Sequence, residues 1–460
     1  MKEERQRIAY PIPKTVYEVL RRIETAGRQA YVVGGAVRDI LMQKDPSDYD
    51  ITTSATPSEI MEIFGQEHCH PTGLEHGTVT VVLDGVPMEV TTFRIDGDYQ
   101  DFRHPDDVVF TRSLEEDVKR RDFTINSLAM DKDGEIVDYC GGIEDIRAKV
   151  IRTVGSADRR FGEDALRILR GLRFASETGF RIEEDTAEQI HKQSGSLSLL
   201  SAERIWKELT RFLCGENCVK VLREFADVFA VVIPEIRPMF GFEQHNPHHI
   251  YDVWEHTLVA MDHTQQDLIP RLTMLLHDIG KPSCFTMDEK GVGHFMGHQK
   301  ISAEMAETIL KRLKSDTATR ETVVELVRVH DITLEPRLKI VRRRLAQYGE
   351  ANLRYLIEIK NADMHAHSEL SAYRFAELRE FESLLDQTIQ MNLCCSYQTL
   401  EISGKDLIEI GIEPGQTLGR IKKQLLDEVI DEEIPNEKQA LLARASEIAG
   451  SVNGSDILQQ

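Results

Sequence analysis

Residues 30–50 of the chain read AYVVGGAVRDILMQKDPSDYD. The apolar run from Ala30 to Val33 predicts a short strand, and the helical pattern after the two glycines predicts a strand-to-helix turn. Because glycine has no Cβ, Gly34 and Gly35 let the backbone N–H groups of this turn approach a triphosphate, with Arg38 one helical turn further on. The stretch therefore predicts a phosphate-binding turn.

Asp48 and Asp50 end the same stretch. Side chains two residues apart on a strand point to one face, so these two carboxylates can converge on a divalent metal ion. The alternative is a surface turn with two solvated aspartates, and the motifs further along the chain disfavour it. We expect a metal-dependent phosphate chemistry on this face.

Length and composition exclude several classes of protein. A chain of 460 residues exceeds what one hydrophobic core usually organises. No apolar run is long enough to span a membrane, and the first residues lack the apolar segment of a signal peptide, so we expect a cytoplasmic protein without membrane contact. The net charge of −22 argues against a nonspecific polyanion binder.

The hydrophobic period changes along the chain. Residues 28–154 alternate apolar strands with helices, whereas the pattern from about residue 157 is almost wholly helical. We predict an α+β fold, in which a small mixed-sheet head is followed by an all-helical neck, a metal-binding domain and a tail. The expected boundaries are 1–155, 156–235, 240–380 and 381–460, with a linker near residues 235–245 that contains Pro238 and Gly241.

Basic residues gather in two segments of this acidic chain. The first segment runs from Asp145 to Arg173, and the second comprises Arg337, Lys339, Arg342, Arg343 and Arg344. Two positive patches on an acidic body suit a specific nucleic acid, although solvated helix faces remain an alternative for the second patch.

The predicted head contains further polar residues that could belong to the nucleotide site. Glu89 is a charge within an apolar strand and serves either as a third carboxylate near the metal or as an edge-strand glutamate facing water. Residues 96–105 combine turn formers with charges, which predicts a mobile loop. Arg121 beside Asp122 suits a clamp for phosphate and ribose, but a surface ion pair has the same pattern.

Asp164 and Arg167 are three residues apart, so on one helix they would be neighbours. A carboxylate acceptor and a guanidinium fork could then read a base edge. Cytosine and adenine offer an exocyclic amine and a ring acceptor, whereas guanine and uracil offer a carbonyl and a ring N–H. The alternative for this motif is a salt bridge on the helix surface.

Residues 31–173 closely resemble the head and neck of bacterial-type tRNA nucleotidyltransferases, the CCA-adding enzymes, and their poly(A) polymerase relatives. The motifs that carry the resemblance are G-G-A-V-R-D, D-Y-D, H-G-T-V, E-V-T-T-F, R-R-D-F-T-I-N and E-D-A-L-R. The last 60 residues also resemble the tRNA-binding end of that family.

This resemblance implies roles for particular residues. Asp48 and Asp50 would be catalytic and hold Mg²⁺, while Asp164 and Arg167 would read the base. The full set implied to bind nucleotide is Gly35, Arg38, Arg121, Asp164, Arg167, Arg170 and Arg173. One departure is Arg103-His104-Pro105, where the family often has two arginines before the proline. This loop is linked in the family to the switch from C to A addition.

Histidines are concentrated in the second half of the chain. Eight of the 16 lie between His245 and His298. The order H, H-D, H, H, D resembles the HD metal-dependent phosphohydrolases, and it implies a second divalent metal of open identity, or a relic site that serves folding. The implied ligands are His256, His277, Asp278, His298, His330 and Asp363.

These observations predict an enzyme that adds C and A nucleotides to the 3′ end of tRNA from CTP and ATP. An A-adding enzyme or a poly(A) polymerase would share every motif. A stand-alone HD phosphohydrolase with a nucleotide-binding head is an alternative of another class, and a noncatalytic RNA-binding module is a third. The sequence leaves the oligomeric state open.

Overall fold

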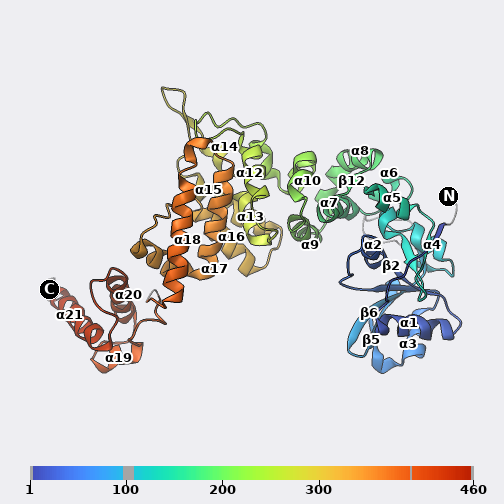
Figure 1. Cartoon of the computed structure of the whole chain (residues 1–460), viewed down its shortest axis with the longest axis horizontal. Helices are drawn as coiled ribbons and strands as arrows, with labels where there is room; N and C mark the ends of the chain where they lie inside the picture. Colours follow the sequence, from blue (N-terminus) through green and yellow to red (C-terminus); the bar gives the residue numbers. More distant parts are fainter. Residues whose placement is uncertain (1–3, 97–107, 394–395, 457–460) are drawn as a thin grey trace. The chain divides into compact units, whose positions relative to one another are not determined.

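The structure of the chain is a computed structural model that describes residues 4–96, 108–393 and 396–456. Most of the loop predicted at 96–105, including Arg103-His104-Pro105, lies outside these residues. The chain divides into two compact units, Met1–Pro234 and Glu235–Gln460. Each unit is described separately (Figure 1).

The first unit begins with a mixed sheet of eight strands in the order β1-β10-β9-β2-β3-β6-β5-β4. Every neighbouring pair is antiparallel except β3 and β6, which run parallel. The strands are β1 Glu4–Arg7, β2 Ala30–Val33, β3 Asp50–Thr53, β4 Cys69–Gly73, β5 Thr78–Leu83, β6 Val86–Thr92, β9 Leu128–Met130 and β10 Glu135–Asp138. The predicted mixed-sheet head is confirmed.

Side-chain periodicity explains how this sheet is covered. In β5, alternate residues of the sequence TVTVVL are buried, as the two-residue period of a strand requires. On α1 (Lys14–Thr25) the buried residues are Val16, Val19, Leu20 and Ile23, which form one helical stripe. Helices α1 and α3 (Pro57–Phe64) are neighbours in the head (Figure 1). The other head helices are α2 Gly35–Leu41, α4 Leu114–Lys119 and α5 Gly142–Ala148.

The head also contains a two-stranded antiparallel sheet of β7 (Arg94–Asp96) and β8 (Val108–Phe110). The rest of the first unit is helical, apart from the short parallel pair β11 (Val150–Ile151) and β12 (Arg181–Ile182). Its first helix starts at Ala157, where the sequence predicts the change of period. The helices are α6 Ala157–Glu163, α7 Leu166–Thr178, α8 Glu184–Gln193, α9 Ala202–Leu213, α10 Cys218–Glu224 and α11 Ala226–Val232.

The second unit is also helical, with one small hairpin of β13 (Thr286–Met287) and β14 (Gly293–His294). Helix α17 is interrupted at Gly349, whose φ of 73° lies outside the helical region. Residues 400–448 contribute a hydrophobic cluster of their own. The helices are α12 Val253–Asp262, α13 Leu268–Leu276, α14 Lys281–Cys284, α15 His298–Arg312, α16 Thr317–Val329, α17 Leu338–His365, α18 Arg374–Gln390, α19 Gly404–Glu409, α20 Gln416–Ile430 and α21 Lys438–Asp456.

None of the helices in the described residues combines the length and the apolar character that a membrane span would need.

Candidate functional sites

A cavity of about 740 Å³ lies within the first unit, between the sheet and helix α7. Nine arginines and five aspartates line it, which makes its wall strongly cationic with one acidic corner. All nine residues that the sequence assigned to catalysis and nucleotide binding line this cavity. They are Gly35, Arg38, Asp48, Asp50, Arg121, Asp164, Arg167, Arg170 and Arg173.

The glycine turn joins β2 to α2 as the sequence predicts. Gly34 has φ 70° and ψ −128°, a conformation that residues with a Cβ rarely adopt, so glycine is required at this position. The first N–H groups of a helix have no intrahelical acceptor. Arg38 follows one turn later and donates from Nη1 to Asn126 Oδ1 at 3.0 Å and from Nη2 to Asp39 Oδ1 at 2.7 Å.

The acidic corner of the cavity is formed by Asp48 and Asp50. Asp48 precedes the strand, because β3 begins only at Asp50, so the expectation that both lie on one strand is wrong in this detail. Glu89 lies on β6, between β3 and β5, and is therefore not on an edge strand. Burial, followed by the charges of Asp48 and Glu89, raises the pKa of Asp50. Carboxylates gathered in this way are typical oxygen ligands of a hard divalent cation.

Arg121 is held between the sheet and α4. Its Nη2 lies 3.4 Å from Asp117 Oδ2, and Arg120 donates to the other oxygen of Asp117 at 2.9 Å. Burial alone would raise the pKa of Asp117, but these two guanidinium groups hold it below its usual value. The buried Nε of Arg121 has no hydrogen-bond partner among the described residues. A donor of this kind suits an anionic ligand.

Asp164 and Arg167 both reach the cavity, but they do not lie on one helix. Asp164 has extended backbone between α6 and α7, and its Oδ1 accepts from the N–H of Leu166 at 3.0 Å. The expected helical spacing is therefore wrong, because the chain leaves the helical conformation at Asp164, directly after α6, before α7 begins. Arg167 lies within α7 and donates from Nη1 to Glu163 Oε2 at 2.5 Å.

Arg170 and Arg173 continue along α7 and surround Phe174. Arg170 donates to Asp122 Oδ2 at 2.7 Å. Arg173 is only 2% exposed and donates from Nε to Glu208 at 2.6 Å and from Nη1 to Glu177 at 2.8 Å. The guanidinium carbon of Arg173 lies 4.1 Å from the centre of the Phe174 ring. Because Arg173 is buried and bonded to both glutamates, it helps to hold this part of the cavity wall in place.

Sequence reasoning missed the partners of these groups. Arg204 on α9 donates from Nη2 to Asp164 Oδ2 at 2.8 Å, and Glu208 on the same helix binds Arg173. Both residues belong to an ordinary amphipathic helix, and nothing in their local sequence distinguishes them from solvated charges. Only the packing of α9 on α7 brings them to the site.

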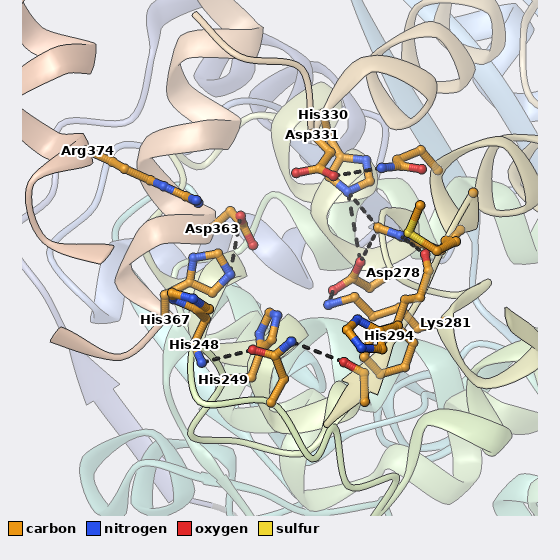
Figure 2. A pocket seen from close by; sticks show the side chains of 17 residues that line it. His248, His249, Asp278, Lys281, His294, His330, Asp331, Asp363, His367 and Arg374 are labelled. Atoms are coloured by element: carbon orange, nitrogen blue, oxygen red, sulfur yellow. Dashed lines mark hydrogen bonds and ion pairs between the residues drawn. The ribbon is translucent and has the colours of Figure 1, made fainter. Parts of the chain in front are cut away.

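A second cavity, of about 530 Å³, lies within the second unit (Figure 2). Asp278, His298, His330 and Asp363 line this cavity, and the buried His256 and His277 contact its two carboxylates. The six predicted metal ligands form two groups. His256 Nε2 lies 2.9 Å from Asp363 Oδ1, and His277 Nε2 lies 3.1 Å from Asp278 Oδ2. On the other side of Asp278, its Oδ1 lies 3.3 Å from His298 Nε2 and 3.9 Å from His330 Nε2. The two oxygens of Asp278 therefore face different groups of ligands: Oδ2 faces His277, and Oδ1 faces His298 and His330.

The four histidines share one hydrogen-bonding pattern. The Nδ1 atoms of His277, His298 and His330 lie 2.7–2.9 Å from the backbone carbonyl three residues earlier. The Nδ1 of His256 lies 3.3 Å from the carbonyl of Ala366. A carbonyl accepts hydrogen bonds only, so these contacts place the proton of the neutral ring on Nδ1 and leave the Nε2 lone pair for a metal.

The electrostatics of this cavity also fit a cation. Burial would lower the pKa of His277, but Asp278 and Asp363 raise it to about 10. Lys281 Nζ lies 2.6 Å from Asp278 Oδ2. The buried carboxylate of Asp278 and the partly buried one of Asp363 therefore need positive charge nearby, and a divalent ion can supply it in place of the proton on His277.

The second basic cluster includes residues with a structural role. Arg342 is 5% exposed and donates to the carbonyls of Val429 and Ile430 at the end of α20. Arg343 and Lys339 pair with Asp431. These contacts join α17 to α20, so three of the five charges serve to hold the tail helix.

Comparisons with known proteins agree with the fold. Residues 30–152 match the Poly A polymerase head domain, residues 179–240 match a probable RNA- and SrmB-binding site of polymerase A, and residues 285–445 match a putative tRNA nucleotidyltransferase domain 2. These matches define a nucleotidyltransferase whose head is of the Poly A polymerase type.

Individual relatives identify the family within this class of nucleotidyltransferases. The CCA-adding enzyme of Latilactobacillus sakei is 35% identical over 433 residues, which are 93% of this chain and 96% of that protein. That of Bacillus cytotoxicus is 50% identical over 209 residues, 45% of this chain and 52% of that protein. The chain belongs to the CCA-adding enzyme family.

Solved structures of CCA-adding enzymes have the same fold as this chain. The Bacillus stearothermophilus CCA-adding enzyme in complex with CTP is 29% identical, with a TM-score of 0.71, over 97% of this chain and 100% of that chain. The Thermotoga maritima CCA-adding enzyme complexed with tRNA is 20% identical, with a TM-score of 0.57, over 96% of both chains, and supports the fold alone.

Proposed function

We propose that this chain adds C and A nucleotides to the 3′ end of tRNA, using CTP and ATP. The supporting observation is that one arginine-rich cavity contains both the acidic pair Asp48 and Asp50 and the base-reading candidates Asp164 and Arg167. Family membership supports the same activity, because relatives that align along nearly the whole chain are CCA-adding enzymes.

The head positions the triphosphate of the incoming nucleotide. The backbone at Gly35 and the guanidinium groups of Arg38 and Arg121 bind its anionic oxygens. Asp48 and Asp50, with Glu89 close by, are the residues that would hold Mg²⁺. An ion bound there would lower the pKa of the attacking 3′ hydroxyl and would stabilise charge on the departing pyrophosphate.

Asp164 and Arg167 read the base in this proposal. The carboxylate of Asp164 accepts from the exocyclic amine of cytosine or adenine, and Arg167 donates to the adjacent ring nitrogen. Guanine and uracil would place a carbonyl against the carboxylate and an N–H against the guanidinium, which leaves both groups unpaired. Arg170 and Arg173 assist by holding α7 through their ion pairs with Asp122 and Glu208.

The test is extension of a tRNA that lacks its last three nucleotides. With CTP alone the enzyme should add two nucleotides and stop, and with CTP and ATP together it should add three. An A-adding enzyme would leave this substrate unchanged with CTP. A poly(A) polymerase would instead add a long run of A from ATP alone.

A second activity is supported by the cavity of the second unit. We propose that His256, His277 and Asp363 hold one divalent cation and that Asp278, His298 and His330 hold another, as the two ligand groups allow. The Oδ2 atom of Asp278, 3.1 Å from His277 Nε2, would also face the first cation. Imidazole with carboxylate suits Mn, Fe, Co or Ni. Metals held in this way activate water against a phosphate ester. Metal-dependent hydrolysis of bis(p-nitrophenyl) phosphate, lost in Asp278→Asn, would support this activity, and its absence at every metal tested would refute it.

Two broader expectations belong to the same proposal. We divide the chain further into a head (1–155), a neck (156–235), a metal-binding domain (240–380) and a tail (381–460). The tail is assigned to tRNA binding. An enzyme that completes tRNA from CTP and ATP would work in the cytoplasm.

A further inference from the structure

A buried carboxylate lies behind the arginines of the nucleotide cavity and is not one of the predicted site residues. Asp117 is on α4 and is 0% exposed, so a substrate cannot contact it directly. Arg120 and Arg121 follow it by three and four residues, and both line the cavity. Asp117 can therefore act on a bound nucleotide only through the residues that it holds.

Both oxygens of Asp117 accept hydrogen bonds. Oδ1 accepts from Nε and Nη2 of Arg120 at 3.0 Å and 2.9 Å, and from the backbone N–H of Arg94 at 3.3 Å. Oδ2 accepts from Oγ1 of Thr52 at 3.1 Å and from Nη2 of Arg121 at 3.4 Å. The carboxylate thus connects β3, the start of β7 and the end of α4.

Thr52 relates Asp117 to the acidic corner of the cavity. Thr52 lies two residues after Asp50 on β3, so the two side chains are on the same face of the strand. Thr52 is 0% exposed, and its hydroxyl faces the Asp117 carboxylate. One strand therefore fixes the distance between Asp50 and the carboxylate that holds the two arginines.

Arg121 lies between the glycine turn and the acidic corner. A Cβ added to Gly34 would be 3.5 Å from Arg121 Nη1, so this guanidinium packs against the turn. Burial and the charges of Asp48 and Glu89 raise the pKa of Asp50, and the charge of Arg121 counteracts them. The guanidinium that Asp117 holds is thus close to both parts of the proposed nucleotide site.

We infer that Asp117 is a positioning residue for nucleotide transfer, which holds Arg121, and with it Arg120, where these side chains meet the triphosphate of the incoming nucleotide. The inference rests on the proposed addition of nucleotides to tRNA. Without the charge of Asp117, the long arginine side chains would adopt several rotamers, and nucleotide binding would have to order them first. The loss should therefore appear in nucleotide binding more than in the chemical step.

The test measures KM and kcat for CTP in the extension of a tRNA that lacks its last three nucleotides. Asp117→Asn is introduced into the full-length parent protein and into Arg121→Gln. In the parent protein it should raise KM by at least about tenfold and change kcat by less than about threefold. In Arg121→Gln it should raise KM by no more than about threefold, through Arg120 alone. A merely structural role would change both backgrounds equally.

Glu59→Gln is the matched control. Glu59 also binds an arginine of the head, Arg28, at 2.5 Å and accepts a backbone N–H, that of Thr56, at 2.8 Å. It lies on α3, outside the lining of the nucleotide cavity. This variant should keep KM for CTP within about twofold of the parent value.

Should Asp117→Asn fail to fold, Thr52→Val replaces it, because this change removes the hydroxyl that faces Asp117 and keeps the charge. It should raise KM by at least about threefold in the parent protein and leave KM unchanged in Arg121→Gln. An unchanged KM in the parent background, or an equal rise in both backgrounds, would overturn the positioning role and leave the proposed activity intact. A parent protein that adds no nucleotide to this tRNA would overturn both.

Discussion

Arg204 on α9 donates a hydrogen bond from Nη2 to Asp164 Oδ2 at 2.8 Å. The other oxygen of Asp164 accepts from the backbone N–H of Leu166 at 3.0 Å. Both oxygens of the proposed base-reading carboxylate are therefore held, one by the first residue of α7 and one by α9. The carboxylate of Asp164 therefore has a fixed orientation before the base of a nucleotide binds.

Replacing Arg204 should loosen this carboxylate. We predict that Arg204→Gln lowers kcat/KM for CTP and ATP by about tenfold or more, since a hydrogen bond between charged groups contributes roughly 1.5–3 kcal/mol. Discrimination against UTP and GTP should fall at the same time. Primer extension with each nucleotide alone measures both effects, as separate KM and kcat values.

Lys207→Gln removes the same charge from an exposed position of α9 and should leave nucleotide preference unchanged. Arg204→Lys should restore part of the discrimination. Unaltered selectivity in Arg204→Gln would show that Asp164 needs no support from α9.

The buried pair of Arg173 and Glu208 should be important for stability. Glu208→Ala leaves the guanidinium of Arg173, which is 2% exposed, with Glu177 as its one remaining carboxylate partner among the described residues. Breaking a buried ion pair on one side typically costs about 3–5 kcal/mol. Urea unfolding followed by circular dichroism should show a loss near the lower end of this range, whereas the exposed change Glu188→Ala should cost little. A loss below about 0.5 kcal/mol, the range of ordinary surface substitutions, would contradict the supporting role of Glu208.

In the proposed catalytic site, the negative charge of Asp50 is needed to bind a metal ion, but it lowers the stability of the metal-free protein. Its pKa lies above the ordinary value of 3.8 because of burial and the charges of Asp48 and Glu89. Stability that is present at low pH is therefore lost as the pH rises from 3.8 through the higher folded value. We predict that Asp50→Asn raises the melting temperature of the metal-free protein at pH 7, and that excess Mg²⁺ narrows the difference. Calorimetry with and without chelator checks both statements, and a lower melting temperature for the variant would contradict them.

The two proposed activities should separate by mutation. Asp278→Asn removes a carboxylate that faces both ligand groups of the second cavity, so phosphate-ester hydrolysis should fall by at least about a hundredfold. Addition of C and A should stay within about twofold, because Asp278 lies in the second compact unit and the nucleotide cavity lies in the first. Parallel loss of both activities would mean that the two centres are coupled.

The sequence predicted what local pattern and motif order encode. The strand at Ala30–Val33 has the predicted bounds, and the glycine turn and Asp48 with Asp50 meet at one cavity because strands β2 and β3 are adjacent. The order of histidines and aspartates likewise identified six residues that converge in space.

Contacts between distant helices could not be predicted. Arg204 lies 40 residues from Asp164, and it reaches Asp164 only because α9 packs on α7. His367 resembles its exposed neighbour His365 in sequence, but a backbone bridge to His249, before α12, places it at the cavity of the second unit. The helical spacing assumed for Asp164 failed because the backbone of Asp164 is extended, so α6 ends before this residue and α7 begins after it.

The most direct test measures single-turnover incorporation of CMP into a tRNA that lacks its last three nucleotides, together with tRNA affinity, for the parent protein and Asp48→Ala. We predict a loss of incorporation of at least about a thousandfold with tRNA affinity within about threefold, because the carboxylate acts on the chemical step rather than on RNA binding. Incorporation at the parent rate in Asp48→Ala would contradict the assignment of the catalytic centre.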